Sequence, residues 1–221
     1  MRQFLTIFLT ILFLITSAFA QKSDVGIVID KMITASGGEE KLLQLNNYKQ
    51  TWNVEFMNSD KSGFDKRTVI LPEYFKTEII YPDKKEIRIV DKESGTKIFG
   101  DKTLQAKGPM LDAMRLQLMR LYHPLELKKR LKDLTMTQNN KQYILALKNG
   151  SIAVEYIVSK KTYLIEKVIG RLQMGPQQME FLTRYEDYKS ENGVLIPHKE
   201  VKFVGSMNTA IMTLKEIKFT K

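Results

Sequence analysis

The sequence has 221 residues, no cysteine, and a formal net charge of +10 at pH 7. The absence of cysteine excludes disulfides, thiolate chemistry, and cysteine-based zinc or iron–sulfur sites. The positive balance permits contact with anionic lipid, acidic polymers or nucleic acid, but the lysines are scattered in ones and twos, which is typical of a solvated face, so we expect no nucleic-acid partner.

Residues 1–20 have the pattern of a cleavable signal peptide. Arg2 supplies a positive start, the run from Phe4 to Ile15 is mostly apolar, and Ala18-Phe19-Ala20 places small residues where a signal peptidase reads. The apolar run is too short to span a membrane, although a retained N-terminal anchor is the alternative. The residue after the predicted cut is Gln21, not the Cys that a bacterial lipoprotein requires. We therefore expect a soluble periplasmic product that is not lipidated and has no transmembrane span.

Residues 21–221 read as one domain that opens with a helix. Apolar residues at helical spacing follow Asp24, and Gly37-Gly38 ends the run. A second helical signal extends from Pro109 to Leu131 and is interrupted at Pro124. These two helices are the elements that the pattern offers for covering a sheet.

The rest of the chain alternates apolar and polar residues with a period of two, which predicts strands. Turn signals such as Asn149-Gly150 connect them as hairpins. The pattern predicts ten to eleven strands, in the ranges 48–56, 66–71, 74–81, 86–90, 95–100, 142–148, 151–159, 163–169, 179–186, 194–204 and 209–219. We expect a mainly β (α+β) fold: a curved antiparallel sheet or incomplete β-barrel, closed by the N-terminal helix and the internal helix.

Catalytic signatures are scarce in this sequence. His123 and His198 have no nearby carboxylate at metal-ligand spacing, so they are interpreted as surface or capping residues and no metal is expected. The carboxylate pairs Glu39-Glu40 and Glu186-Asp187 lack an apolar setting that would raise a pKa. No nucleophile elbow, phosphate-binding loop or dinucleotide fingerprint is present. We expect no enzyme, no catalytic residue and no cofactor.

Two groups of apolar side chains are candidates for lining a cavity. The methionines of the internal helix would suit a pliable lid over an acyl chain or apolar peptide. Ordinary packing of an amphipathic helix on a sheet is the favoured interpretation. The strand aromatics would either line a cavity or fill a solid core, and a curled sheet of this size is wide enough to leave space. The candidate lipid-binding residues are Trp52, Val54, Phe56, Phe75, Ile79, Tyr81, Ile87, Ile89, Phe99, Met110, Met114 and Leu118.

The opening IVIDKMITASGGEEKLLQLNNYKQTWNVEF, residues 27–56, resembles the start of LolA-like outer-membrane lipoprotein-sorting proteins of Gram-negative bacteria. Residues 71–80, 144–168 and 184–201, including the turn that leads to Ile-Pro-His, are also similar to that family. The resemblance implies a curved antiparallel half-barrel whose helices close an apolar cavity. It further implies carriage of lipoproteins by their acyl chains, or binding of lipids and sensing of envelope components, without catalytic residues.

Two hypotheses of function follow. The first is a periplasmic carrier that shields the acyl chains of a lipoprotein or another amphiphile in an apolar cavity, takes part in outer-membrane lipoprotein sorting, and touches membranes only peripherally. The second is a non-catalytic structural or sensory module of the envelope, with a filled core and a protein partner docked along an exposed strand edge. An open apolar groove under the internal helix would favour the carrier.

Overall fold

The computed structural model describes residues 24–57 and 61–220. The predicted signal peptide, residues 1–20, lies outside the described residues. Within the described ranges, no helix is both long enough and apolar enough to cross a membrane.

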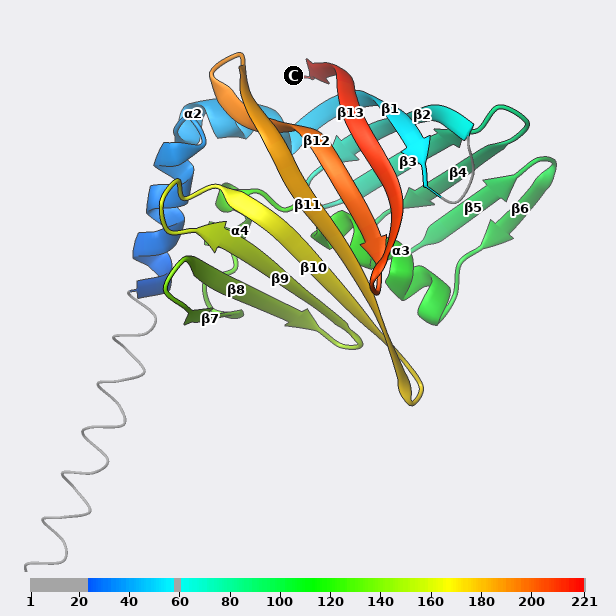
Figure 1. Ribbon diagram of the computed structural model, residues 1–221. Helices are drawn as coiled ribbons and strands as arrows, with labels where there is room; N and C mark the ends of the chain where they lie inside the picture. The colour runs from blue at the N-terminus through cyan, green and yellow to red at the C-terminus, as the bar shows by residue number, and fades with distance from the viewer. Residues whose placement is uncertain (1–23, 58–60, 221) are drawn as a thin grey trace, which may run out of the picture.

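One curved, fully antiparallel sheet contains all thirteen strands of the described chain (Figure 1). The strands of the first half are β1 (Asn47–Phe56), β2 (Lys61–Ile70), β3 (Tyr74–Ile80), β4 (Lys85–Val90), β5 (Gly95–Phe99) and β6 (Lys102–Gln105). Those of the second half are β7 (Leu134–Gln138), β8 (Gln142–Asn149), β9 (Ile152–Ser159), β10 (Ile165–Met174), β11 (Gln177–Glu191), β12 (Val194–Val204) and β13 (Met207–Phe219). The order across the sheet is β6-β5-β4-β3-β2-β1-β13-β12-β11-β10-β9-β8-β7.

The two halves join where β1 pairs with β13, far apart in sequence. The register runs from Tyr48 opposite Phe219 to Phe56 opposite Ala210, with a bulge between Thr51 and Trp52. Every other pair in the described sheet links strands that follow each other in the chain. As a result, β6 and β7 form the two edges, and the sheet curves without closing.

The mainly β, curved antiparallel architecture is confirmed, but the strand count of ten to eleven was too low. The two strands missing from the prediction are β6 and β7, which form the edges. All four residues of β6 are exposed, and β7 has five residues of which only Leu134 is buried. An edge strand needs only one neighbour and buries little, so its sequence carries no strong alternation.

Helices cover one end and the inner face of the sheet (Figure 1). The first runs over residues 24–35. It is followed by α2 (Glu39–Leu42) and the short 3₁₀ helix η1 (Leu43–Asn46). The connection from β6 to β7 holds α3 (Pro109–Met119) and α4 (Pro124–Lys128), so the predicted internal helix is confirmed. Its interruption covers residues 120–123, and Pro124 begins α4 rather than ending the first segment.

Two glycines let α3 lie close against both halves of the sheet. A Cβ on Gly170 of β10 would lie 2.8 Å from Leu116 Cδ1 and 2.8 Å from Arg120 Cδ. A Cβ on Gly95 of β5 would lie 3.0 Å from Leu111 Cδ1. Larger residues at these positions would push the helix off the sheet. α3 is therefore fixed across the interior of the curved sheet.

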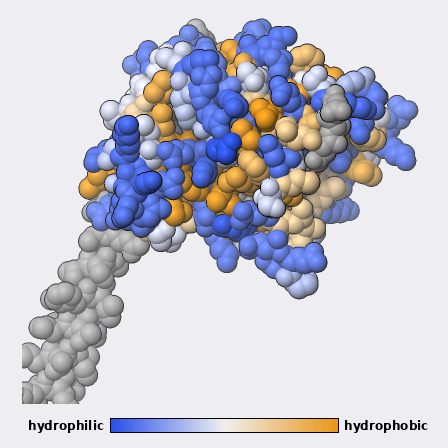
Figure 2. Space-filling view, in the orientation of Figure 1, coloured by the Kyte–Doolittle hydropathy of each residue, from blue (hydrophilic) through white to orange (hydrophobic). Residues whose placement is uncertain are grey.

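The outer surface is polar and mixed. On the face shown in Figure 2, hydrophilic side chains cover most of the surface, and apolar side chains gather near its middle. Neighbouring strands carry surface ion pairs such as Lys85–Glu78 and Lys199–Glu186, with N–O distances of 2.6 and 2.9 Å. This distribution is that of a solvated face.

Candidate functional site

A cavity of about 410 Å³ lies between the inner face of the sheet and the end of α3. A volume of this size falls in the range of ligand pockets, roughly 300–1,000 Å³. Its apolar wall consists of aromatic and aliphatic side chains from β1, β3, β11, β12, β13 and the adjoining loops: Val54, Phe56, Phe75, Ile79, Tyr81, Leu121, Phe181, Val204, Ala210 and Met212.

A second, smaller cavity of about 110 Å³ lies beside the first. It is bordered by β1, β10, β12, α2 and the turn that follows α3, with Tyr48, Trp52, Val168 and Ile196 among its apolar lining residues. Arg120, Leu121, Tyr185 and Glu200 border both cavities. The two cavities therefore share a polar boundary inside the curved sheet.

Six of the twelve predicted lipid-binding residues border these cavities. Val54, Phe56, Phe75, Ile79 and Tyr81 line the larger one, where the rings of Phe56 and Tyr81 stack with centroids 4.7 Å apart. Trp52 lines the smaller one. The period-two alternation of β1 and β3 identified these positions, because one face of each strand is directed inward.

Ile87 and Ile89 are directed away from the cavities. In the β3–β4 register, Ile87 lies opposite Glu78 and Ile89 opposite Lys76, and those two partners form an ion pair at 2.6 Å. The opposite face of β4 carries the charged residues Glu86 and Arg88 and the buried Val90, and Arg88 borders the larger cavity. In β4 the isoleucines therefore lie on the outer face, whereas in β1 the apolar residues lie on the inner face.

The other four predicted residues also lie outside both cavities. Phe99, at the end of β5, is 43% exposed, and Met110, in the first turn of α3, is 37% exposed. Met114 and Leu118 are buried in the hydrophobic core. The ordinary packing of α3 on the sheet therefore accounts for two of the helix residues.

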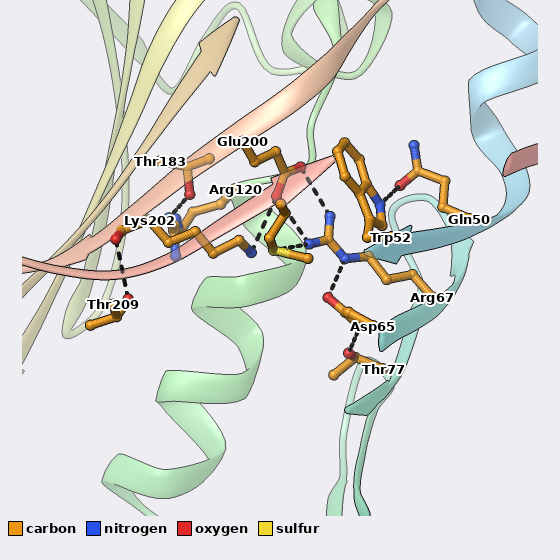
Figure 3. Close-up of polar contacts among 11 residues, drawn as sticks. Gln50, Trp52, Asp65, Arg67, Thr77, Arg120, Thr183, Glu200, Lys202 and Thr209 are labelled. Atoms are coloured by element: carbon orange, nitrogen blue, oxygen red, sulfur yellow. Dashed lines mark hydrogen bonds and ion pairs between the residues drawn. The ribbon is translucent and has the colours of Figure 1, made fainter. Parts of the chain in front are cut away.

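A buried network of charges crosses the interior, and the sequence analysis missed it (Figure 3). Arg67 of β2 donates from Nη1 and Nη2 to the two carboxylate oxygens of Glu200 on β12, each at 3.0 Å. Arg67 Nε donates to Asp65 at 2.8 Å, and the Thr77 hydroxyl donates to the same carboxylate. The guanidinium also lies over the Trp52 ring, 5.1 Å from its centroid. Such charge-assisted, bidentate contacts hold the side chains in one geometry.

The charges in this network stabilise each other's ionised forms. Burial alone would raise the pKa of Glu200, but the charges of Arg67 and Lys202 outweigh it and lower that pKa to about 2. Burial alone would lower the pKa of Arg67, but Glu200 and Asp65 outweigh it and raise that pKa. Arg67 therefore stays cationic and Glu200 anionic at neutral pH.

A second cationic group lies on the other side of Glu200. Lys202 of β12 approaches Glu200 Oε2 at 3.3 Å, and burial together with repulsion by Arg67 lowers the pKa of Lys202 to about 8. Arg120, the residue after α3, donates to the hydroxyl of Thr183. Thr183 lies opposite Lys202 in the β11–β12 register. Figure 3 shows Arg120 reaching toward these two strands.

A signal for the network was present in the sequence of β2. Asp65 and Arg67 occupy the same strand face as Val69, which is buried. Charged residues at inward positions of a strand are unusual, since a buried charge needs a partner. The partner Glu200 lies 133 residues away from Arg67, so the pairing itself could not be read locally.

His123 is buried rather than on the surface, which corrects that part of the prediction. It occupies the N-cap position of α4 without a side-chain capping bond, and its Nε2 lies 3.0 Å from Asn46 Oδ1. Its Nδ1 is buried without a hydrogen-bond partner in the described residues. Burial lowers the pKa of His123 to about 4, which keeps the ring neutral.

The chain matches no protein-family model and no curated protein. It does match solved structures. A LolA superfamily protein, NE2245 from Nitrosomonas europaea, superposes with a TM-score of 0.56 at 9% identity, covering 86% of this chain and 92% of that one. A domain described as an outer membrane lipoprotein-sorting protein domain, from Vibrio parahaemolyticus, gives 0.51 at 10% identity, covering 82% and 90%.

The fold and its internal cavity define the class: the chain has a LolA-like fold. At these identities the likeness concerns the fold alone. What the cavity holds must be argued from the residues that line it.

Proposed function

We propose that this protein is a non-catalytic, periplasmic lipid-binding carrier that shields acyl chains of a lipoprotein or another amphiphile inside its curved sheet. The observation that carries the proposal is the cavity of about 410 Å³ between the sheet and α3. A sheet with a filled interior would have favoured a module without a ligand.

The lining of the cavity supports an amphiphile as its ligand. Phe56, Tyr81 and Phe75 form an aromatic wall at one side, and Phe181 lies at the other. Each methylene that moves from water into such a wall contributes about 0.8 kcal/mol, so a single acyl chain supplies useful yet reversible binding. The solved structure named for lipoprotein sorting makes a lipid-modified protein the first cargo to test.

The test is native mass spectrometry of the protein purified from a Gram-negative envelope, followed by titration with a triacylated lipopeptide. We expect co-purified lipid and saturable lipopeptide binding. Absence of both would overturn the proposal.

A matched pair of variants locates the binding. Ala210 lines the cavity, whereas the next residue of β13, Ile211, is not among its lining residues. Ala210→Phe should weaken lipopeptide binding roughly tenfold, because the loss of two buried methylenes costs about 1.6 kcal/mol. Ile211→Phe should leave the affinity unchanged, and equal losses in both variants would argue against the cavity.

A second candidate function is an envelope module that binds a protein along a strand edge. It is favoured by β6, whose four residues are all exposed and which pairs only with β5 in the described sheet. An edge of this kind can accept an added strand. A chain that binds no lipid in the titration above would favour this function.

A further inference from the structure

Arg120 occupies a distinctive place in the interior. It follows α3 directly, borders both cavities, and is partly exposed to them. Its side chain has one hydrogen-bond partner among the described residues, the hydroxyl of Thr183.

The other interior cations have carboxylate partners. Arg67 pairs with Asp65 and Glu200, Lys202 pairs with Glu200, and Arg88 pairs with Glu86 at 2.6 Å. No described carboxylate lies within 4.0 Å of the Arg120 guanidinium, and its Nε is buried without a hydrogen-bond partner. Among the described residues, the interior therefore holds one cation more than its carboxylates neutralise.

The Nε of the Arg120 guanidinium therefore lacks an acceptor among the described residues. Burial lowers the pKa of Arg120, which reports the cost of removing its charge from water. The C-terminal end of α3 offers a favourable dipole but no acceptor for Nε. The planar guanidinium matches carboxylate and phosphate oxygens, to which it can donate two parallel hydrogen bonds.

Two further donors lie beside it. Thr183 and Lys202 face each other across β11 and β12, and both border the larger cavity (Figure 3). The apolar wall of the same cavity includes Phe181 and Val204, which lie opposite each other on these two strands. A polar group at Arg120 would thus be continuous with an apolar surface for a chain.

We propose that Arg120, together with Thr183 and Lys202, binds the oxyanion of an amphiphile, a carboxylate or a phosphate, while the attached chain lies along the apolar wall. The inference rests on the proposed lipid-binding function and specifies the ligand: a chain with an anionic group at one end. The Arg120 guanidinium orients the anionic group, and the apolar wall of the cavity binds the attached acyl chain.

The experiment measures displacement of the neutral probe N-phenyl-1-naphthylamine from the full chain. The ligands share one sixteen-carbon chain: palmitate supplies a carboxylate, a lysophosphatidic acid supplies a phosphate, and hexadecanol supplies no charge. Acetate and inorganic phosphate supply the anion without a chain.

Three variants are compared: Arg120→Gln, the charge-retaining Arg120→Lys, and the control Arg115→Gln. Arg115 is a suitable control because it lies on α3 but donates to the Lys92 carbonyl outside the cavities. Thermal unfolding checks that each variant folds.

We expect the unmodified chain to bind palmitate or the lysophosphatidic acid roughly tenfold more tightly than hexadecanol, as a hydrogen-bonded charge pair would give. The better of the two anions identifies the head group. Arg120→Gln should abolish the preference without changing hexadecanol affinity, Arg120→Lys should keep part of it, and Arg115→Gln should keep all of it.

The outcomes separate this inference from the function on which it rests. If all three long-chain ligands bind with equal affinity and Arg120→Gln changes none of them, the oxyanion site is overturned while lipid binding stands. If acetate or phosphate alone competes in an Arg120-dependent way and the chain adds nothing, the site holds a free anion and the inference is also overturned. If no long-chain ligand binds, both proposals fail.

Discussion

Buried polar side chains in this protein are held by specific partners, and the titrating ones couple folding to pH. His123 is neutral and buried beside Asn46. Burial lowers its pKa most, and the charges of Glu126 and Lys129 act on that pKa in opposite directions. Its folded-state pKa of about 4 lies below the value of about 6.5 expected in the unfolded chain. Protonation therefore favours the unfolded state.

The sign of the effect follows from that depressed pKa. The contribution of a neutral His123 to stability is complete above pH 6.5 and is lost as the pH falls from about 6.5 to about 4, by about 3 kcal/mol in total. Urea unfolding of the wild type between pH 7.5 and pH 4.5 should show this loss. His123→Gln should flatten the pH dependence.

Two comparisons separate the effect of His123 from the effects of other titrating groups. The chain has one other histidine, so His198→Gln is the matched comparison variant for the loss of one imidazole. Glu200 acts in a lower window, because its lowered pKa makes it lose stabilising charge only as the pH falls from about 4.5 toward about 2. A His123→Gln variant with an unchanged slope above pH 4.5 would contradict the assignment.

Among the elements, the packing of α3 against Gly170 of β10 determines how closely the helix approaches the sheet. A Cβ at Gly170 would meet Leu116, which is buried, as well as the Arg120 side chain. Gly170→Ala should therefore destabilise the fold by about 1–3 kcal/mol through overpacking. Chemical denaturation measures the change directly.

The control for this substitution is a glycine without such a neighbour. Gly26 lies within the helix over residues 24–35, and a Cβ there would have nothing within 4 Å. Gly26→Ala should stabilise the protein by up to about 1 kcal/mol, because alanine loses less backbone entropy than glycine in a helix. Equal effects of the two substitutions would show that α3 does not depend on close contact with β10.

Across the molecule, the central strands of the described sheet are paired on both sides and the two edge strands on one side only. β1 and β13 each have a partner on both sides, whereas β6 and β7 each have one in the described sheet. Hydrogen exchange followed by mass spectrometry should find the slowest amides in β1 and β13 and the fastest strand amides in β6. The exposed residues of β6 and its single neighbour are the physical reason.

The dependence on protein concentration serves as the control for this experiment. A free edge should exchange at the same rate after a tenfold dilution. Protection of β6 equal to that of β1, lost on dilution, would show that copies of the chain pair edge to edge in solution.

Much of the fold could be predicted because its signals are local. The alternation in β1 identified Trp52 and Val54 as inward, and the helical spacing after Pro109 identified α3. The same reasoning failed at Ile87 and Ile89, because the alternation of β4 places charged residues inward. Hydrophobicity predicts the buried face of a strand only where the interior is apolar.

Local sequence patterns are enough to predict the strand-rich architecture, the two helical segments and the turns between hairpins, since these depend on periodicity within a few residues. The pairing of β1 with β13, the weak edge strands and the charged residues at the cavity become visible only in the folded chain. Those features join residues far apart in the chain, as Arg67 and Glu200 show, and the free energy of burying a charge depends on a partner that no local pattern identifies.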